Sequence, residues 1–418
     1  MSKISKIEIS KFWGNKDISL SLHPDVNFLI GRNGSGKTTI INIITAAIRV
    51  DISSLLVLPF SSVIISFDDS SCISVRKKLK TFTEGLEYSV RFRNNRQKVF
   101  NISSIEPFRF LLKDTLGSSS SHFEYKSDRD NCLEEINRLI QLSWVSVNRT
   151  SLLEGYSEQD QERDKTTTDV VLNKLSIDLS SFFSRLQTCY NNEMKKFQKY
   201  VFESFVEETG NVYEDKYISS DENRLLDIYK RFDIQDADNK VSSFYKKFRA
   251  CLEKSRNHEP LDITDLSLCF EAFRIHSLVN KWMEIDKAQT KIFERREVFF
   301  NIMNDLLSHK EIIINSSNEI RIKNLIDGSL FDVSKLSSGE KQLLIILGRA
   351  LLQEDEGSYC YITDEPELSL HVEWQEKLAS SIIRISPHSQ VIFATHSPDI
   401  VGPYQDRIIN VESIIYGK

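Results

Sequence analysis

The stretch NFLIGRNGSGKTTIINII places a glycine-rich turn between two hydrophobic runs, and it limits the possible folds more than any other feature. The turn fits the pattern GxxxxGK[ST]. It follows a predicted strand and precedes a predicted helix, which is the context that this motif requires. Backbone N–H groups in such a turn, with the positive end of the following helix, form a cradle for phosphate oxygens. The stretch therefore predicts a nucleotide-phosphate site in an α/β core.

The motif assigns roles to individual residues. Lys37 is expected to reach the β- and γ-phosphates, and the Thr38 hydroxyl is expected to bind Mg²⁺, a hard cation that prefers oxygen ligands. The loop residues expected to contact the nucleotide are Arg32, Asn33, Gly34, Ser35, Gly36, Lys37, Thr38 and Thr39. A chance glycine-rich loop is the alternative interpretation, and the strand and helix on either side count against it.

The catalytic half of such a site is expected much later in the chain, in GSYCYITDEPELSLH. The apolar run YCYIT predicts a strand that ends at Asp364 and Glu365. Asp364 fits a second Mg²⁺ ligand that acts through water, and Glu365 is placed to polarise the attacking water. Two carboxylates at a strand end could instead cap a helix, but that interpretation leaves the apolar strand and the distant phosphate loop unexplained.

Two further segments complete the predicted site. LSSGEKQLLIILGRALL places Ser337, Ser338 and Gly339 at the start of a strongly apolar helix, whose N-terminus would form a second anion site. A simple helix cap is the alternative, because serine is a favoured N-cap residue. The segment VIFATHSPD places His396 just after a strand, where its imidazole could contact the γ-phosphate.

The rest of the chain divides into a β-rich part and a helical part. Residues 62–104 show short alternating strands, which predict an antiparallel β arm, and residues 114–131 indicate a polar loop. Apolar residues spaced by threes and fours form two stripes, at 175–205 and 278–306. The stripes predict an antiparallel helical arm, or equally a plain helical bundle that buries its own core.

Overall composition narrows the class of protein. A net charge of -6 gives no global reason to expect non-specific nucleic-acid binding, although local basic clusters are present. The 6 cysteines are scattered without a CxxC pair, which indicates reduced thiols. No apolar run is long enough to span a membrane, and the N-terminus lacks a signal-peptide core. The chain is therefore expected to be cytoplasmic, with no membrane partner.

Together with the phosphate loop, LSSGEKQ, DEPE and THSP resemble the signature, Walker B and switch-histidine motifs of the ATP-binding-cassette (ABC) superfamily. The resemblance is to the branch that holds SMC, RecF and the OLD (overcoming lysogenization defect) ATPases. It implies an α/β fold: an ABC-type ATPase head with a P-loop mixed sheet, an antiparallel β arm and a long, coiled-coil-like helical insertion. Residues 1–150 would form the N-terminal half of the head, 151–310 the insertion, and 311–418 the C-terminal half.

The resemblance also implies how the site works. Ser337 and Gly339 would contact the γ-phosphate of ATP bound to a neighbouring copy of the chain, so the site would be completed only when two heads enclose ATP. Glu365 would be the general base and His396 the γ-phosphate sensor. The implied activity is slow hydrolysis of ATP to ADP and phosphate, with ATP and Mg²⁺ as ligands.

The chain departs from the wider superfamily in two places. PELSLH follows the catalytic glutamate, and this DEPExxLH form resembles OLD-like ATPases specifically. A glutamine-loop residue that contacts the metal is not evident, and Asn148 is the candidate, with Gln141 behind it. OLD nucleases continue into a TOPRIM domain after the histidine region, whereas this sequence ends at Lys418. The chain is thus expected to resemble the ATPase subunit of two-gene anti-phage systems such as PARIS or Septu.

Two functions follow from these features. The first is an ATP-binding and ATP-hydrolysing sensor and scaffold of an anti-phage defence complex, which assembles as a homo-oligomer. It would hold a separate effector, a TOPRIM- or HNH-type nuclease or a toxin, until a trigger such as a phage-encoded protein releases it. The alternative is a RecF- or SMC-like DNA-maintenance ATPase that binds DNA through the basic strands VRKKLK and VRFRNNRQK. Those strands could equally form a solvated face.

Overall fold

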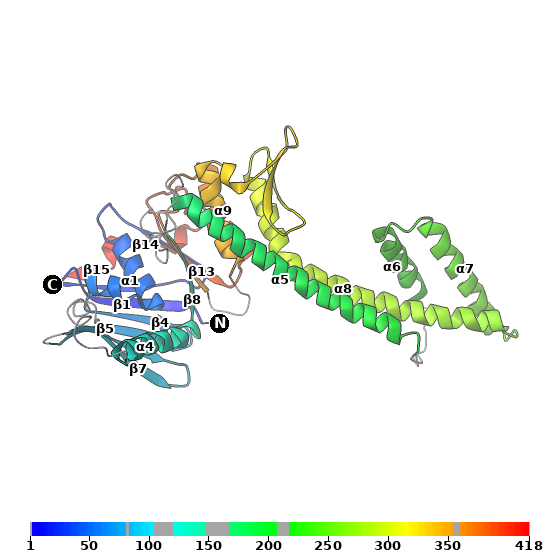
Figure 1. Ribbon diagram of the computed structural model, residues 1–418, viewed down its shortest axis with the longest axis horizontal. Coiled ribbons are helices and arrows are strands. Elements are labelled where there is room, and N and C mark those ends of the chain that lie inside the picture. Colours follow the sequence, from blue (N-terminus) through cyan, green and yellow to red (C-terminus); the bar gives the residue numbers. More distant parts are fainter. Residues whose placement is uncertain are drawn as a thin grey trace. The chain divides into compact units, whose positions relative to one another are not determined.

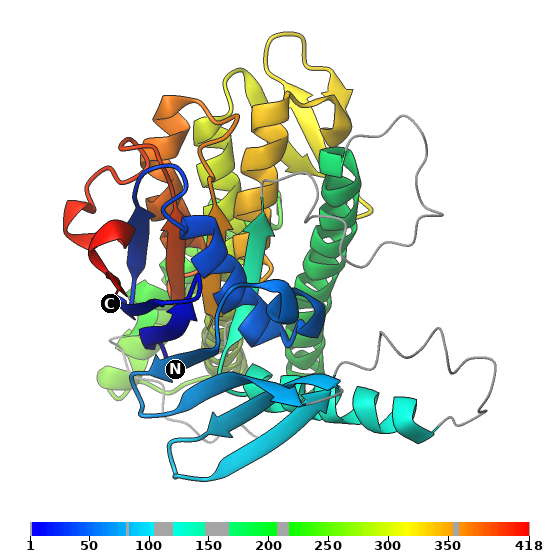
Figure 2. The ribbon, with the colours of Figure 1, turned by 90° about the vertical axis from the view of Figure 1, so that its left-hand side faces the viewer.

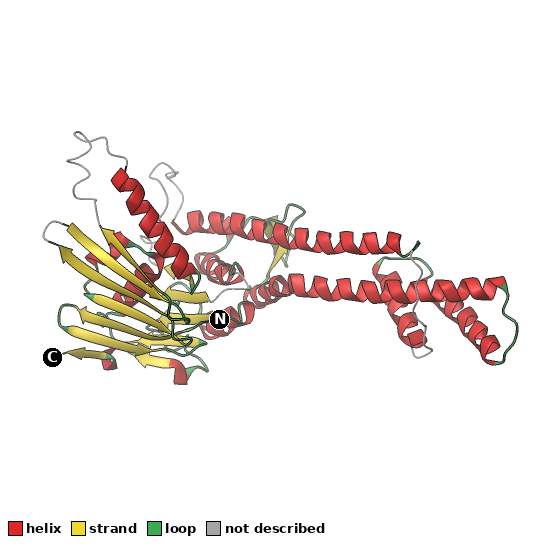
Figure 3. Ribbon diagram, turned by 90° about the horizontal axis from the view of Figure 1, so that it is seen from below, coloured by secondary structure: helices red, strands yellow, loops and turns green. Residues whose placement is uncertain are grey.

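The computed structural model describes residues 2–80, 83–103, 120–146, 167–206, 217–353 and 359–417. The chain divides into two compact units, one made of residues 1–182 and 295–418 and the other of residues 183–294. The first unit contains all the described strands, and the second is helical (Figure 3). The predicted α/β class is confirmed.

A five-stranded sheet lies at the centre of the first unit. Its strands, in spatial order, are β14 (Ile408–Asn410), β3 (Val26–Ile30), β13 (Ser389–Ala394), β12 (Tyr359–Asp364) and β8 (Gln141–Ser146). All neighbouring strands are parallel. The strands β12 and β13 are buried along their whole length, as expected for apolar strands covered on both faces. Because the carboxyl ends of parallel strands share one edge, the segments that follow β3, β12 and β13 meet there.

A second, antiparallel sheet of seven strands forms the predicted β arm. Its strands, in spatial order, are β15 (Ile415–Gly417), β2 (Lys16–Ser21), β1 (Ile4–Phe12), β4 (Ser62–Phe67), β5 (Cys72–Lys80), β6 (Thr83–Arg91) and β7 (Gln97–Ser103). The last strand pairs with β2, so this sheet contains both the first and the last strands of the chain (Figure 2).

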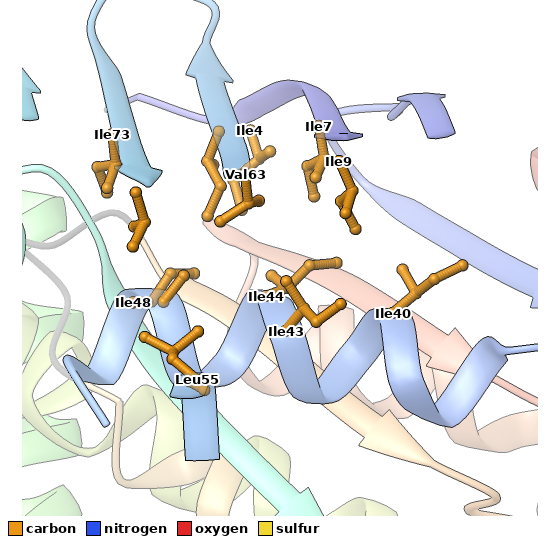
Figure 4. Packing of buried hydrophobic residues seen from close by; sticks show 14 of the residues in the cluster. Ile4, Ile7, Ile9, Ile40, Ile43, Ile44, Ile48, Leu55, Val63 and Ile73 are labelled. Atoms are coloured by element: carbon orange, nitrogen blue, oxygen red, sulfur yellow. The ribbon is translucent and has the colours of Figure 1, made fainter. Parts of the chain in front are cut away.

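The helix α1 (Lys37–Arg49) follows the glycine-rich turn and packs against strands of both sheets. Its isoleucines Ile40, Ile44 and Ile48 face the apolar side chains of β1 and β4 (Figure 4). Burial of one such side chain contributes about 1.5–3 kcal/mol. The row of isoleucines therefore fixes the start of α1, and with it the glycine-rich turn, against the centre of the unit.

The remaining elements of the first unit surround this core. They are α2 (Ile52–Val57), α4 (Ser120–Asn137), β9 (Lys310–Ile314), β10 (Ile320–Asn324), β11 (Leu330–Phe331), α9 (Ser338–Leu351) and α10 (Val372–Ile385). Short 3-10 turns lie at η4 (Val333–Lys335), η5 (Gln405–Arg407) and η6 (Val411–Ser413). The prediction of a polar loop at residues 114–131 is wrong from Ser120 onward, because α4 begins there. Residues 114–119 lie outside the described residues. Burial of Cys132 and Ile136 in the core stabilises this helix despite its polar first half.

The helical insertion consists of α5 (Thr167–Glu203), α6 (Ile218–Arg231), α7 (Ala237–Arg256) and α8 (Ile263–Leu306), labelled in Figure 1. Ring contacts join Tyr190 to Phe293 at 5.7 Å and Phe197 to Trp282 at 5.4 Å, so α5 and α8 run side by side and antiparallel. Of the two arrangements that the apolar stripes predict, this is the antiparallel pair. The helices α6 and α7 share a small core with the start of α8, around Tyr245 and Ala272.

The boundaries between the two units fall inside α5 and α8, so one end of each long helix belongs to the first unit. The three-part division at residues 150 and 310 stays a proposal about functional modules. None of the helices in the described parts of the chain combines the length and the hydrophobicity needed to cross a membrane.

Arg295 of α8 fixes that helix to the ends of two others. Its guanidinium group donates to the Ile385 carbonyl at 3.1 Å, at the end of α10. It also donates to the carbonyls of Gln353 at 2.6 Å, Leu351 at 2.9 Å and Ala350 at 3.3 Å, at the end of α9. The last carbonyls of a helix lack partners within the helix and carry partial negative charge, so a cation satisfies both needs.

The substitution Arg295→Ala is expected to lower the free energy of unfolding of this unit by about 2–4 kcal/mol, because several buried carbonyls lose a charged donor. The measurement is chemical denaturation followed by circular dichroism. The matched control is Lys377→Ala, which removes an exposed cation from α10 and should cost about 0.5 kcal/mol or less. Equal destabilisation by the two substitutions would contradict the assigned role of Arg295.

Candidate functional site

The glycine-rich turn connects β3 to α1 at the carboxyl edge of the parallel sheet. Gly34 and Gly36 have φ values of 78° and 98°, in the left-handed region that favours glycine. At Gly36, a Cβ atom would lie 2.9 Å from Phe12 Cζ and 3.1 Å from Trp13 Cη2. Gly36 is therefore required both by its backbone conformation and by the close approach of two aromatic rings.

Lys37 lies folded over this turn. Its side chain is only 4% exposed, and Nζ donates to the Gly31 carbonyl at 2.8 Å and to the Arg32 carbonyl at 3.3 Å. Burial lowers the pKa of Lys37 below its usual value, while the negative charges of Asp364 and Glu365 act in the opposite direction. The ammonium group thus lies inside the turn, facing the carboxylates that follow β12.

Asp364 ends β12 and is 5% exposed. Burial raises its pKa above the usual value and the charge of Glu365 adds to this effect, whereas a hydrogen bond from Thr38 and the charge of Lys37 lower it. Its Oδ1 atom has no hydrogen-bond partner among the described residues. A buried carboxylate oxygen without a partner, beside a threonine hydroxyl, is a donor set that fits hydrated Mg²⁺.

Glu365 and His396 face one another from neighbouring strand ends. His396 Nε2 lies 3.9 Å from Glu365 Oε1, and the two side chains are 35% and 32% exposed. Glu365 has a φ of 49°, which is unfavourable for a residue with a Cβ atom, and its N–H donates to the Ala394 carbonyl at 2.8 Å. Glu365 and His396 are thus partly open to solvent, next to the buried Asp364.

The start of α9 has a different geometry. Ser337 and Glu340 form a capping box: the Ser337 N–H donates to Glu340 Oε2 at 2.8 Å, and the Glu340 N–H donates to Ser337 Oγ at 3.3 Å. Lys310 Nζ also contacts Glu340 Oε1 at 2.7 Å. The simple helix cap that was the alternative interpretation is therefore present, and Ser337 and Ser338 remain exposed to solvent.

Gly339 is buried under the segment that follows Glu365. A Cβ atom at this position would lie 2.5 Å from the Ser369 carbonyl oxygen, so only glycine fits. Among the described residues, no hydrogen bond joins residues 337–339 to the glycine-rich turn. Within one chain, then, the turn, Asp364, Glu365 and His396 come together, and the start of α9 packs on the segment after Glu365 without a hydrogen bond to the turn among the described residues.

The remaining predicted residues lie near the tip of the turn. An open pocket of about 400 Å³ borders it, lined by Trp13, Lys16, Arg32, Asn33, Gly34, Ser35, Glu412 and Ile415. The Arg32 N–H donates to Glu412 Oε1 at 3.1 Å. Thr39 is half-buried in the first turn of α1. Asn148 lies outside the described residues, and Gln141 begins β8 at the opposite end from the site.

Sequence reasoning missed three side chains at this edge of the sheet. Trp13 and Glu412 border the pocket although they come from the two ends of the chain, and no local pattern singles them out. Glu367 accepts a hydrogen bond from the His396 N–H at 2.7 Å. Its place in the DEPE motif was the available signal, but the motif alone does not reveal the contact.

Comparisons with known proteins agree on the class of chain. A family model described as AAA ATPase domain matches residues 2–401. The curated protein "Retron Vc95 probable ATPase" of Vibrio cholerae serotype O1 biovar El Tor is 32% identical over 101 residues. That match covers 23% of this chain and only 20% of the relative, so the chain is similar to about a fifth of that protein's length.

Among solved structures, the chain is similar to the Smc head domain with an extended coiled coil bound to the C-terminal domain of ScpA from Pyrococcus furiosus. The TM-score is 0.37 with 16% identity, over 96% of this chain and 91% of that chain. It is also similar to the Smc head domain with a coiled coil and joint from Pyrococcus yayanosii. There the TM-score is 0.38 with 16% identity, over 96% and 93% of the two chains.

Proposed function

The chain belongs to the AAA ATPase domain family, and from that premise we propose that it binds ATP with Mg²⁺ and hydrolyses ATP slowly at a site completed by two copies of the chain. One observation carries this proposal. Lys37, Thr38, Asp364, Glu365 and His396 meet at one edge of the parallel sheet, whereas Ser337 and Ser338 are exposed and make no hydrogen bond to the glycine-rich turn among the described residues. Each copy would lend its α9 N-terminus to the phosphates bound by the other.

Each residue of the phosphate loop has a defined task in this proposal. Lys37 exchanges its contacts with the Gly31 and Arg32 carbonyls for the β- and γ-phosphate oxygens of ATP. Thr38 and Asp364 hold Mg²⁺ through oxygen ligands. When bound, Mg²⁺ neutralises negative charge that develops on the phosphate oxygens. The backbone N–H groups of the turn bind the same oxygens without further rearrangement.

Glu365 acts as the general base. Its carboxylate accepts a proton from water while the water oxygen attacks the γ-phosphorus and the bond to the ADP oxygen breaks. His396 donates a hydrogen bond to a γ-phosphate oxygen from the neighbouring strand end, 3.9 Å from Glu365. Since both side chains are only about one-third exposed, a partner's α9 would exclude water from their open side.

The setting that fits this chain best is an anti-phage defence complex, in which it serves as sensor and scaffold. The DEPExxLH form and the local similarity to a retron ATPase support this setting. In that role the chain forms a homo-oligomer and holds a separate effector, a TOPRIM- or HNH-type nuclease or a toxin, until a phage-encoded trigger appears. The cytoplasm is the compartment that suits such a complex.

The test is a mild affinity purification of the tagged chain from its native host. The mass of the particle is measured, and whatever co-purifies is identified. A homo-oligomer that carries a second protein with nuclease metal ligands is the expected result. A monomer or dimer that carries DNA and no protein partner would overturn the proposal in favour of a DNA-maintenance ATPase.

The β arm carries both paired and exposed basic side chains. Of those on its strands, Lys77 donates to the carbonyls of Leu56 and Leu58, Lys78 pairs with Glu87, and Lys98 pairs with Glu135 at 2.5 Å. The arginines Arg76, Arg91, Arg93 and Arg96 remain exposed and are the groups through which a DNA-maintenance ATPase would contact phosphates. For a defence scaffold, a rate of ATP hydrolysis that does not change on adding DNA at low salt is expected. A rate that DNA raises, and that falls steeply with salt, would favour the DNA-maintenance alternative.

A further inference from the structure

Glu367 joins the segment after β12 to the segment after β13. Its Oε1 atom accepts hydrogen bonds from the His396 N–H at 2.7 Å and from the Ser397 N–H at 3.3 Å. Glu367 lies two positions after Glu365, so one short segment carries both the proposed base and the anchor of the proposed sensor. Bonds between a carboxylate and backbone N–H groups are among the stronger hydrogen bonds in proteins.

The remaining hydrogen bonds of this segment involve the residues next to His396. The Ser397 N–H also donates to Thr395 Oγ1 at 2.9 Å, and Ser397 Oγ donates to Gln375 Oε1 at 2.7 Å. Gln375 Nε2 in turn donates to the Leu370 carbonyl at 2.9 Å. Among the described residues, only Glu367 contacts the backbone of His396 from the segment that contains Glu365. The bond from the Glu365 N–H to the Ala394 carbonyl and the bridge through Gln375 join the same two segments on either side of His396, and Glu367 is the side chain that holds the His396 N–H itself.

The strained backbone of Glu365 explains why the bonds made by Glu367 matter. A residue with a Cβ atom at a φ of 49° costs about 1–2 kcal/mol, and such strain persists only where the surroundings enforce it. Two contacts enforce it here: the bond from the Glu365 N–H to the Ala394 carbonyl and the anchor made by Glu367 two residues later. Loss of the anchor frees both the strained residue and the sensor segment.

We propose that Glu367 is a positioning residue: by accepting the His396 and Ser397 N–H groups it holds His396 facing Glu365, and so sets the rate of hydrolysis without contributing to ATP affinity. This inference rests on the proposed function, since it assigns Glu367 to the same reaction. Glu367 contacts neither Lys37 nor the glycine-rich turn through any hydrogen bond that its side chain makes.

A second way for Glu367 to act is through its charge. Burial is the main cause of the lowered pKa of Lys37 and of the raised pKa of Asp364, and the Glu367 carboxylate is a smaller influence that acts to raise both. The substitution Glu367→Gln separates the two possibilities, because glutamine keeps an oxygen that can accept the His396 N–H but removes the negative charge. The substitution Glu367→Ala removes both, and Glu367→Met removes both while keeping most of the side-chain volume.

The experiment measures kcat and KM for ATP with the full-length chain and these three variants. A misplaced catalytic group costs up to about 100-fold in rate, so Glu367→Ala and Glu367→Met should lower kcat by about 10- to 100-fold with KM within about threefold of wild type. Glu367→Gln should recover to within about threefold of the wild-type kcat. The control is Glu373→Ala, an exposed glutamate at the start of α10, which should hydrolyse ATP as the wild type does.

Three outcomes would overturn the inference: an unchanged kcat in a folded Glu367→Met variant, a Glu367→Gln variant as slow as the alanine variant, or a loss expressed in KM. If the wild type does not hydrolyse ATP, or if Glu365→Gln hydrolyses it at the wild-type rate, the proposed function itself fails. If the wild type hydrolyses ATP, Glu365→Gln does so far more slowly, and the Glu367 variants behave as wild type, only the positioning role fails.

Discussion

The substitution Lys37→Ala is expected to abolish ATP binding, with an affinity at least about 100-fold below that of the wild type. A charged donor contributes about 1.5–3 kcal/mol per hydrogen bond, and Lys37 would make such bonds to two phosphates. Lys37 is 4% exposed and feels the charges of four carboxylates, so its removal leaves negative charge at the phosphate site. The expected loss is larger than for any other single contact of the loop.

Isothermal titration with ATP and Mg²⁺ measures this effect. The matched control is Lys377→Ala, which removes an exposed lysine from α10 and should leave ATP affinity unchanged. Both variants should fold, since the isoleucine row of α1 remains intact. ATP affinity of a folded Lys37→Ala variant close to that of the wild type would show that the glycine-rich turn is not the phosphate site.

The substitution Glu365→Gln is expected to keep ATP binding and to lower hydrolysis by about 100-fold or more, because an amide cannot take the proton from water. The phosphate cradle is untouched. Removal of one negative charge also relieves repulsion between Glu365 and the bound phosphates. ATP should therefore persist between two copies of the chain and hold them together.

Light scattering with and without ATP and Mg²⁺ measures that closed state. The Glu365→Gln variant should gain mass on addition of ATP and keep it, while the wild type should return to its starting mass as ATP is consumed. The control is Glu376→Gln, an exposed glutamate on α10 that should behave as wild type. Equal hydrolysis by the wild type and Glu365→Gln would defeat the assignment of the base.

Sequence reasoning succeeded where the pattern is local. The strand–turn–helix order around Lys37 and the apolar run that ends at Asp364 are both contiguous in the chain, so period and turn chemistry predict them. The two apolar stripes likewise predict α5 and α8, because a sustained spacing of three and four is helical. Their antiparallel pairing follows from the same stripes.

It failed where the structure depends on contacts between distant segments. Glu412 reaches the phosphate loop only because the end of the chain returns to pair with β2. Arg295 reads as an ordinary charged residue in a helix, and only the packing of α8 brings it to the ends of α9 and α10. The helix α4 was missed because its first half is polar and its stability comes from burial at Cys132 and Ile136.

The start of α9 shows why a motif can carry two interpretations. Ser337 caps the helix, as the simple alternative holds, and this cap leaves the exposed N-terminus oriented as an anion site. Capping and phosphate binding do not exclude each other, because the helix N-terminus carries partial positive charge whether or not Ser337 caps it.

The most direct test of the composite site is ATP hydrolysis by a mixture of two inactive variants. Lys37→Ala disables the phosphate loop. Ser338→Glu places a negative charge at an exposed helix N-terminus, which suits the helix but repels a partner's γ-phosphate. Each variant alone should be inactive. An equal mixture should recover about a quarter of the wild-type rate, because half of the randomly formed pairs contain one intact site of two. No recovery from two folded, inactive variants, or full activity of Ser338→Glu alone, would contradict a site shared between two copies.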